Sequence, residues 1–299
     1  MIPRHGENSE HLLKSFSKTR KGEKTMDCFK GKIAIVTGGA SGIGRAVCEA
    51  LAKYGATTVI ADINLEGSQE VSKAISANGG SASAAELDVR DAEAIGKLID
   101  ETVAEHGRLD YMFNNAGINI AGEARDMLPE HWKRVLDINL MGVVHGTRIA
   151  YSLMVKQGFG HIVNTSSLCG LMPVPLEAPY ATAKHAVVGL STSLRAEGAA
   201  LGVKVSAFCP GVIQTPLIEK SLVLNSNMDE ILSISPLKIM GLNDALQVLL
   251  RGVARNQGII ICPFESRMSW MLYRLAPAFM DKLMAKSLVE FREKRSEGK

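Results

Sequence analysis

Tyr180 and Lys184 lie four residues apart in Tyr180-Ala-Thr-Ala-Lys184, a segment with the apolar pattern of a helix. At this spacing both side chains project from one face of the helix, one turn apart. A tyrosine with its ordinary pKa of about 10 is a poor base at neutral pH, but a neighbouring lysine cation favours the phenolate. We therefore expect Lys184 to lower the pKa of Tyr180. Tyr180 could then accept a proton during alcohol oxidation and donate one during carbonyl reduction.

A second group of residues could bind a dinucleotide. The β-branched run 33–36 predicts a buried strand, the glycines Gly38, Gly42 and Gly44 predict a tight turn, and residues 47–54 follow at helical spacing. Such glycines let the backbone approach a pyrophosphate closely, and the helix N-terminus offers free N–H groups and the positive end of its dipole. The next apolar run ends at Asp62, 18 residues past Gly44, where a carboxylate is placed for the adenosine ribose hydroxyls.

An α/β sheet must position these residues. Short apolar runs predict seven strands, at 33–37, 57–61, 83–87, 110–114, 160–165, 203–208 and 258–262. Helical patterns lie between them, near 43–54, 66–77, 91–106, 130–157, 178–201 and 243–255. Strands separated by helices require a parallel sheet covered on both faces. We expect a single doubly wound α/β domain of the Rossmann type, with about seven parallel strands and no dividing linker.

The two ends of the chain differ from this domain, which we expect to span residues 26–262. Residues 1–25 are polar, charged and aperiodic, so they are expected to be a disordered extension, with Met26 as the natural start. Residues 263–299 have an amphipathic pattern flanked by basic residues and are expected to pack on the domain or on a partner subunit. A substrate cover and a membrane-surface helix are the alternatives for this segment.

Composition and charge exclude several classes of protein. The 299 residues are 46% hydrophobic and 22% charged, and the formal net charge of +3 is carried entirely by residues 1–25. Because residues 26–299 have no net formal charge, a nucleic-acid-binding surface is not expected. The five cysteines are scattered and have neither zinc-ligand nor disulfide spacing, which favours a reducing compartment and no metal. No apolar run reaches the roughly 18 residues of a membrane span, and no signal peptide is visible, so we expect a cytoplasmic protein.

Several motifs occur together in an order and spacing that resemble the short-chain dehydrogenase/reductase family of NAD(P)-dependent oxidoreductases. They are Thr37-Gly-Gly-Ala-Ser-Gly-Ile-Gly44, Leu87-Asp-Val89, Asn114-Asn-Ala-Gly117, Asn139, Ser167, Tyr180-Ala-Thr-Ala-Lys184 and Pro210-Gly-Val-Ile-Gln-Thr215. The resemblance covers residues 26 to about 262. It implies hydride transfer between a nicotinamide dinucleotide and an alcohol or ketone.

The resemblance assigns catalytic roles to Asn139, Ser167, Tyr180 and Lys184. Ser167 precedes Tyr180 by 13 residues, a spacing that matches the family's serine and favours it over Ser166. Its hydroxyl would hydrogen-bond the substrate oxygen, where charge changes during transfer. Asn139 matches the asparagine that holds a water near the lysine for a proton relay.

The resemblance also implies a set of cofactor contacts. The matching positions are Thr37, Gly38, Ser41, Gly42, Ile43, Gly44, Asp62, Ile63, Asp88, Val89, Asn115, Ala116, Gly117, Tyr180, Lys184, Pro210, Gly211, Ile213 and Thr215. Among them, Asp88 and Val89 match adenine contacts, and Thr215 matches the contact to the nicotinamide carboxamide. Family members that use NADP usually carry a basic residue just before the second glycine or just after the second strand, where this chain has Ser41 and Ile63-Asn64. Because Asp62 would also repel a 2′-phosphate, we expect NAD rather than NADP.

The expected substrate is a small lipophilic secondary alcohol or ketone, such as a steroid, retinoid or fatty-chain compound. The family's pocket walls match segments 168–177 and 216–240, which are rich in apolar residues. Within the first, Cys169 is expected to pack in the core and Glu177 to be a solvated loop carboxylate, with anchoring of a polar substrate group as the alternative for Glu177. In the family, the helices that contain Asn139 and Tyr180 commonly form the subunit interface, so we expect a homodimer or homotetramer.

Two other functions are compatible with a dinucleotide fold. One is an NAD-binding sensor or regulatory protein without turnover, although such proteins often lose the tyrosine or the lysine. The other is an epimerase or dehydratase with bound NAD, which usually has a larger C-terminal substrate domain than this chain offers. Because all four catalytic positions are filled, we favour the dehydrogenase.

Overall fold

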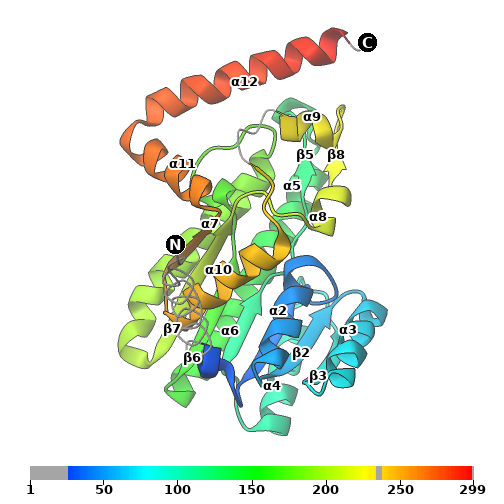
Figure 1. Cartoon of the computed structure of the whole chain (residues 1–299), viewed down its shortest axis with the longest axis vertical. Coiled ribbons are helices and arrows are strands. Elements are labelled where there is room, and N and C mark those ends of the chain that lie inside the picture. Colours follow the sequence, from blue (N-terminus) through cyan, green and yellow to red (C-terminus); the bar gives the residue numbers. More distant parts are fainter. Residues whose placement is uncertain (1–25, 234–237, 298–299) are drawn as a thin grey trace, which may run out of the picture.

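A computed structural model describes residues 26–233 and 238–297 of the chain (Figure 1). Its centre is a sheet of seven parallel strands in the order β3-β2-β1-β4-β6-β7-β9. The strands are β1 (Ile33–Thr37), β2 (Thr57–Asp62), β3 (Ser81–Glu86), β4 (Tyr111–Asn114), β6 (Gly160–Thr165), β7 (Val203–Pro210) and β9 (Ile259–Cys262). These are the seven predicted strands. The prediction for residues 1–25 lies outside the described residues.

Helices cover both faces of the sheet, which confirms the predicted doubly wound fold. They are α2 (Gly42–Lys53), α3 (Leu65–Ala77), α4 (Ala92–His106), α5 (Pro129–Leu136), α6 (Gly142–Gln157), α7 (Ala178–Gly198), α8 (Pro216–Glu219), α9 (Met228–Ser233), α10 (Leu242–Ala254), α11 (Phe264–Leu275) and α12 (Pro277–Glu297). Helices α2, α3 and α10 share one apolar core with one face of the sheet. Helices α4, α6 and α7 pack on the other face.

Strand β1 lies at the point where the winding of the chain reverses. All five of its residues are buried, as its continuous apolar run predicts for a strand covered on both faces. The chain winds outward from β1 through β2 to β3 and then returns to form β4 on the other side of β1. At such a reversal the loops after neighbouring strands part in opposite directions, which leaves a crevice at the carboxyl ends of β1 and β4.

One predicted helix has an irregular turn in its course. The sequence predicts a single helix over 130–157, whereas the structure has α5, then the π-helical turn η3 (Asp137–Met141), then α6. Asn139 lies in this turn and is completely buried. Its Nδ2 donates to the carbonyl oxygen of Ile118, and its Oδ1 accepts from the N–H of Ile118, both at 2.8 Å. The turn therefore aligns Asn139 with the loop after β4, and such π turns are frequent at functional sites.

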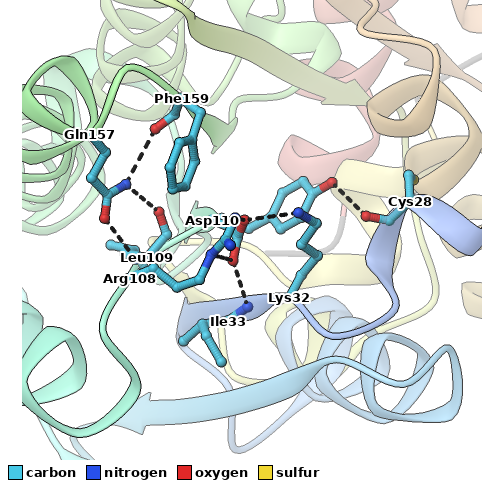
Figure 2. A network of polar contacts seen from close by, with 9 residues as sticks. Cys28, Lys32, Ile33, Arg108, Leu109, Asp110, Gln157 and Phe159 are labelled. Carbon is cyan, nitrogen blue, oxygen red and sulfur yellow. Dashed lines mark hydrogen bonds and ion pairs between the residues drawn. The ribbon is translucent and has the colours of Figure 1, made fainter.

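The buried carboxylate of Asp110 joins the amino ends of β1 and β4 (Figure 2). This is the opposite end of the sheet from the crevice at the carboxyl ends of the same two strands. Asp110 accepts a hydrogen bond from the N–H of Ile33 at 3.0 Å. It also pairs with Lys32 at 3.3 Å and with Arg108 at 2.5 Å. These contacts hold β1 and β4 together at their amino ends, away from the crevice.

The C-terminal segment crosses the carboxyl-end side of the sheet, as the red helix at the top of Figure 1 shows. Met280 of α12 packs against Leu168 and Met172. Arg292 donates to Oε2 of Glu123 through Nε at 3.1 Å and Nη2 at 2.7 Å. The segment thus packs on its own domain. Beneath α12, β5 (Ile120–Ala121) and β8 (Leu222–Val223) form a small parallel sheet that the sequence did not predict.

None of the helices in the described part of the chain is both long and apolar enough to cross a membrane.

Candidate active site

A cavity of about 810 Å³ lies along the carboxyl ends of the central strands. This volume is typical of sites for small molecules and cofactors. Most of the predicted site residues line it: Gly38, Ser41, Gly42, Ile43, Asp62, Ile63, Asp88, Val89, Asn115, Ala116, Gly117, Ser167, Tyr180, Lys184, Pro210, Gly211, Ile213 and Thr215. The fold therefore gathers the segments at the carboxyl ends of six neighbouring strands, β3, β2, β1, β4, β6 and β7. Thr37, Gly44 and Asn139 lie behind the cavity wall, where they support the residues that line it.

The glycine-rich turn after β1 has the backbone geometry of an anion site. Gly38 and Gly42 have φ values of +66° and +53°, in the left-handed region that favours glycine. A Cβ at Gly44 would lie 2.1 Å from the carbonyl oxygen of Gly38, so only glycine fits behind the turn. Helix α2 begins at Gly42, and its N-cap residue, Ser41, makes no side-chain hydrogen bond to the helix. The first N–H groups of α2 are thus left for an anion such as a pyrophosphate, which is the fit expected for a dinucleotide.

Thr37 connects the end of β1 to the end of β4. Its Oγ1 accepts hydrogen bonds from the N–H groups of Asn115 at 2.9 Å and Ala116 at 3.1 Å. In return, Nδ2 of Asn115 donates to the carbonyl oxygen of Thr37 at 3.1 Å. These bonds set the position of the cavity-lining residues Asn115 and Ala116.

Two carboxylates, at the end of β2 and just after β3, line the cavity. Asp62, the last residue of β2, accepts from the N–H of Ala40 at 3.1 Å and from the N–H of Asn64 at 2.9 Å. Its position is therefore set by the glycine-rich turn on one side and by the start of α3 on the other. Asp88 pairs with Arg90 at 2.5 Å, and this hydrogen-bonded ion pair lowers the pKa of the Asp88 carboxyl. Arg90 also lines the cavity, although sequence reasoning did not single it out.

Tyr180 and Lys184 project from the first turns of α7, as their spacing predicts. Nζ of Lys184 donates to the carbonyl oxygen of Thr165 at 2.8 Å and lies 5.4 Å from the centre of the Tyr180 ring. Burial lowers the pKa of Lys184 from its ordinary 10.5 to about 8.

The expected lowering of the Tyr180 pKa is wrong for this structure. Burial raises the pKa of Tyr180, and the neighbouring Cys169 and Glu177 side chains add to the rise, against a smaller opposite effect of a hydrogen bond with Ser167. Desolvation of the phenolate thus outweighs the attraction of the Lys184 cation that the sequence spacing suggests.

The two neighbouring serines after β6 have different surroundings. Ser166 is buried and donates to the carbonyl oxygen of Lys184 at 2.8 Å, which ties β6 to α7. Ser167 also lines the cavity; its Oγ accepts from the N–H of Cys169 at 3.2 Å and donates to the carbonyl oxygen of Pro210 over a longer 3.4 Å. The weakly held Ser167 hydroxyl is thus free to turn toward a ligand oxygen near Tyr180.

Glu177 is not the solvated loop carboxylate that we expected. It lies in the cavity wall next to the start of α7, and burial raises the pKa of its carboxyl. Its Oε1 accepts from Nδ2 of Asn119 at 2.8 Å, and its Oε2 accepts from the thiol of Cys169 at 3.1 Å. Cys169 is buried as expected, but its thiol faces this carboxyl. The sequence gives little sign of Asn119 beyond its place just after the Asn114-Asn-Ala-Gly117 motif.

The rest of the cavity wall includes polar residues such as Lys220, Ser269 and Ser287, but many of its side chains are apolar. As the sequence predicts, these apolar side chains come from segment 168–177 and from the segment after β7, where Leu217, Ile218 and Ile231 contribute. Helix α12 adds Met280, Leu283 and Met284, so the C-terminal segment covers this end of the cavity. Within residues 26–233 and 238–297, no cluster of side chains suits a metal ion.

Known proteins resemble this chain in sequence and in structure. A family model described as short chain dehydrogenase matches residues 32–223. The 2,5-dichloro-2,5-cyclohexadiene-1,4-diol dehydrogenase of Sphingobium indicum is 37% identical over 215 residues, or 71% of this chain and 85% of that protein. The cyclohexanol dehydrogenase of an Acinetobacter strain is 37% identical over 198 residues, or 66% of this chain and 79% of that protein. A crystal structure of a short chain dehydrogenase/reductase from Burkholderia phymatum in complex with NAD matches with a TM-score of 0.77 at 26% identity, covering 84% of this chain and 96% of that one.

Proposed function

The chain belongs to the short-chain dehydrogenase/reductase family of oxidoreductases, and we propose that it transfers hydride between NAD and a secondary alcohol or ketone. The observation that carries the proposal is the meeting of Ser167, Tyr180 and Lys184 on the wall of a cavity that also holds the glycine-rich turn and Asp62. When bound there, the nicotinamide dinucleotide supplies the hydride acceptor or donor and, in its oxidised form, a positive charge.

Tyr180 is the proposed general acid and base. In carbonyl reduction, its hydroxyl donates a proton to the substrate oxygen, and in alcohol oxidation its phenolate accepts one. Because burial raises the pKa of Tyr180, the phenol is the resting form, which suits donation. Lys184 is largely protonated at neutral pH, and its ammonium, held by the carbonyl of Thr165, stabilises the phenolate when that form is needed.

Ser167 and Asn139 support this proton transfer in different ways. The hydroxyl of Ser167 hydrogen-bonds the substrate oxygen, where negative charge develops. Asn139 is a positioning residue in this proposal, because both polar atoms of its amide are bonded to the main chain of Ile118. It orients the loop after β4, which includes Gly117; a Cβ at Gly117 would lie 3.1 Å from Oδ1 of Asn139 and 3.7 Å from Nζ of Lys184.

The proposed substrate is a lipophilic secondary alcohol or ketone, with alicyclic compounds first among those to test. Apolar side chains from three segments bound the substrate end of the cavity. Two relatives are named as dehydrogenases of cyclohexanol and of a dichlorinated cyclohexadienediol, which are alicyclic alcohols.

NAD is the proposed cofactor, in preference to NADP. Asp62 stands at the adenosine end of the cavity with both oxygens held by main-chain N–H groups. A carboxylate in this place accepts hydrogen bonds from ribose hydroxyls and repels a 2′-phosphate. The Burkholderia phymatum structure contains NAD, which supports the same choice.

Turnover of cyclohexanol and related alcohols, followed by the absorbance of the reduced nicotinamide, tests the proposal. We expect NAD-dependent turnover that Tyr180→Phe lowers by at least about a hundredfold, the usual range for a general acid–base residue. Tyr54→Phe is a matched control, because Tyr54 is the C-cap residue of α2, stacks on Phe29 and does not line the cavity. NAD binding without turnover of any alcohol or ketone in a broad panel would contradict the enzyme and favour a sensor.

We further propose a cytoplasmic homodimer or homotetramer. All five cysteines are free thiols, which suits a reducing compartment. Small residues, Ala186, Gly189 and Ser193, lie on the exposed face of α7, where they would allow a second subunit to approach closely. Light scattering after size-exclusion chromatography measures the assembly, and a monomer at micromolar concentration would contradict it.

A further inference from the structure

We propose that Glu177 and Asn119 form a binding subsite for a second hydroxyl group of the substrate, so that the preferred substrates are diols or hydroxyketones rather than simple alcohols. This inference rests on the proposed function and names its substrate class more narrowly. It starts from two hydrogen-bonded polar residues, Glu177 and Asn119, in the cavity wall.

The position of Glu177 places its carboxyl beside the reacting groups. Glu177 is the N-cap residue of α7, and Tyr180 follows three residues later in the first turn. Side chains three residues apart at this end of a helix are neighbours. Both residues line the same cavity, and the carboxyl is close enough to raise the pKa of the Tyr180 phenol. A group bound by Glu177 would therefore belong to the molecule whose oxygen reacts at Tyr180.

After their hydrogen bonds within the protein are counted, the side-chain oxygens of Glu177 and Asn119 can still accept further hydrogen bonds. Glu177 receives one hydrogen bond on each oxygen, from Asn119 and from Cys169, and a carboxylate can accept about four. Because the amide of Asn119 turns its NH₂ group toward Glu177, its Oδ1 is the atom left over. This Oδ1 is buried and has no hydrogen-bond partner among the described residues. The pair therefore has unused acceptor capacity on both side chains, and a ligand that donates a hydrogen bond would meet it at the Glu177 carboxyl in the cavity wall.

The surroundings of the pair favour a hydroxyl as that donor. The segment that precedes Glu177 also lines the cavity with Leu168, Met172 and Val174, whose apolar side chains supply no donor. A simple alcohol that fills the cavity would exclude water and leave the acceptors of Glu177 and Asn119 unpaired, which is unfavourable. A second hydroxyl would supply the missing hydrogen bond. A substrate carboxylate or phosphate has only acceptors and would be rejected.

The test compares kcat/KM for the isomeric cyclohexanediols with kcat/KM for cyclohexanol, with NAD as cofactor. We expect the wild-type protein to prefer its best diol by about tenfold or more, as a site built to hydrogen-bond a hydroxyl discriminates against analogues that lack it. Glu177→Met should reduce this ratio to near one, and Asn119→Ala should reduce it severalfold. Glu177→Gln, which keeps one carbonyl acceptor, should restore part of the preference. Glu197→Met is the matched control, because Glu197 is an exposed acid at the other end of α7.

The ratio separates a binding role from a structural one. A residue that only stabilises the fold would lower both kcat/KM values together and leave the ratio unchanged. If wild type turns over cyclohexanol but shows no diol preference, or if Glu177→Met and Asn119→Ala both leave the ratio unchanged, the subsite is refuted while the dehydrogenase proposal stands. A preference for aminocyclohexanols over the diols would also overturn it, in favour of an ammonium site. If no alcohol or ketone is turned over, the proposed function fails and the subsite with it.

Discussion

Replacement of Asp62 by serine should move the cofactor preference from NAD toward NADP. The carboxylate lies at the end of β2, lines the cavity and is held in place by the N–H groups of Ala40 and Asn64. Serine removes its negative charge but keeps a hydroxyl that can bond a ribose oxygen. The substitution therefore tests the charge at this position more than its shape.

The size of the effect follows from the charge that is removed. Two unit charges about 4 Å apart interact by about 4 kcal/mol at an effective dielectric constant of about 20. Asp62 is partly exposed, so we take about half of this value, about 2 kcal/mol, as the repulsion of a 2′-phosphate after screening. At about 1.4 kcal/mol for each factor of ten, the ratio of kcat/KM with NAD to kcat/KM with NADP should fall about 30-fold.

The assay is the initial rate of alcohol oxidation with each cofactor, measured for wild type, Asp62→Ser and Asp100→Ser. Asp100 is an exposed acid of α4 that does not line the cavity, so its variant loses the same charge at a distance and should keep the wild-type ratio. A wild-type preference for NADP would refute the assignment of Asp62. So would a ratio in Asp62→Ser that stays within about threefold of wild type, because 2 kcal/mol predicts a tenfold larger change.

Two further predictions concern stability. Because burial lowers the pKa of Lys184 from 10.5 to about 8, the unfolded chain binds more protons between these values, and the free energy of unfolding should rise with pH across this window. This contribution is lost as the pH falls through about 8. Urea unfolding at several pH values should show that the free energy of unfolding rises more steeply with pH for wild type than for Lys184→Met, and equal slopes for the two proteins would contradict the prediction. Gly44→Ala should destabilise the fold by about 1–3 kcal/mol, because its Cβ would meet the Gly38 carbonyl oxygen at 2.1 Å. Gly96→Ala, whose Cβ meets only a side-chain methyl at 3.9 Å, should instead stabilise it by about 0.5–1 kcal/mol, and a similar loss in both melting temperatures would refute the argument.

The fold class and the positions of the main elements could be predicted from the sequence because they depend on local patterns. The continuous apolar run of β1 indicates a strand buried on both faces, and the structure buries all five of its residues. Among the glycines that follow, Gly38 and Gly42 have backbone angles that favour glycine and Gly44 has no room for a Cβ, so the residue types alone indicate the turn. The spacing of Tyr180 and Lys184 likewise places them on one side of α7, because helix geometry repeats along the chain.

Several features of the site depend on contacts between distant segments. Asn119 and Glu177 are 58 residues apart, and only the packing of the loop after β4 against the start of α7 makes Glu177 a partly buried, hydrogen-bonded carboxyl in place of the predicted solvated one. The π turn around Asn139 accompanies its hydrogen bonds with Ile118, which no helical pattern reveals. The cover that α12 forms over the cavity depends in the same way on packing between segments that are far apart in sequence.

The direction of the Tyr180 pKa shift shows the physical reason for this division. The residue types and their spacing determine that a tyrosine and a lysine meet, and thus which groups can exchange a proton. Whether the phenolate is favoured depends on how much water surrounds it and on every charge nearby. In the structure, Tyr180 is desolvated and lies near Cys169 and Glu177, so its pKa rises although Lys184 is close. How deeply a side chain is buried depends on neighbours from the whole fold, so it cannot be predicted from a local pattern in the sequence.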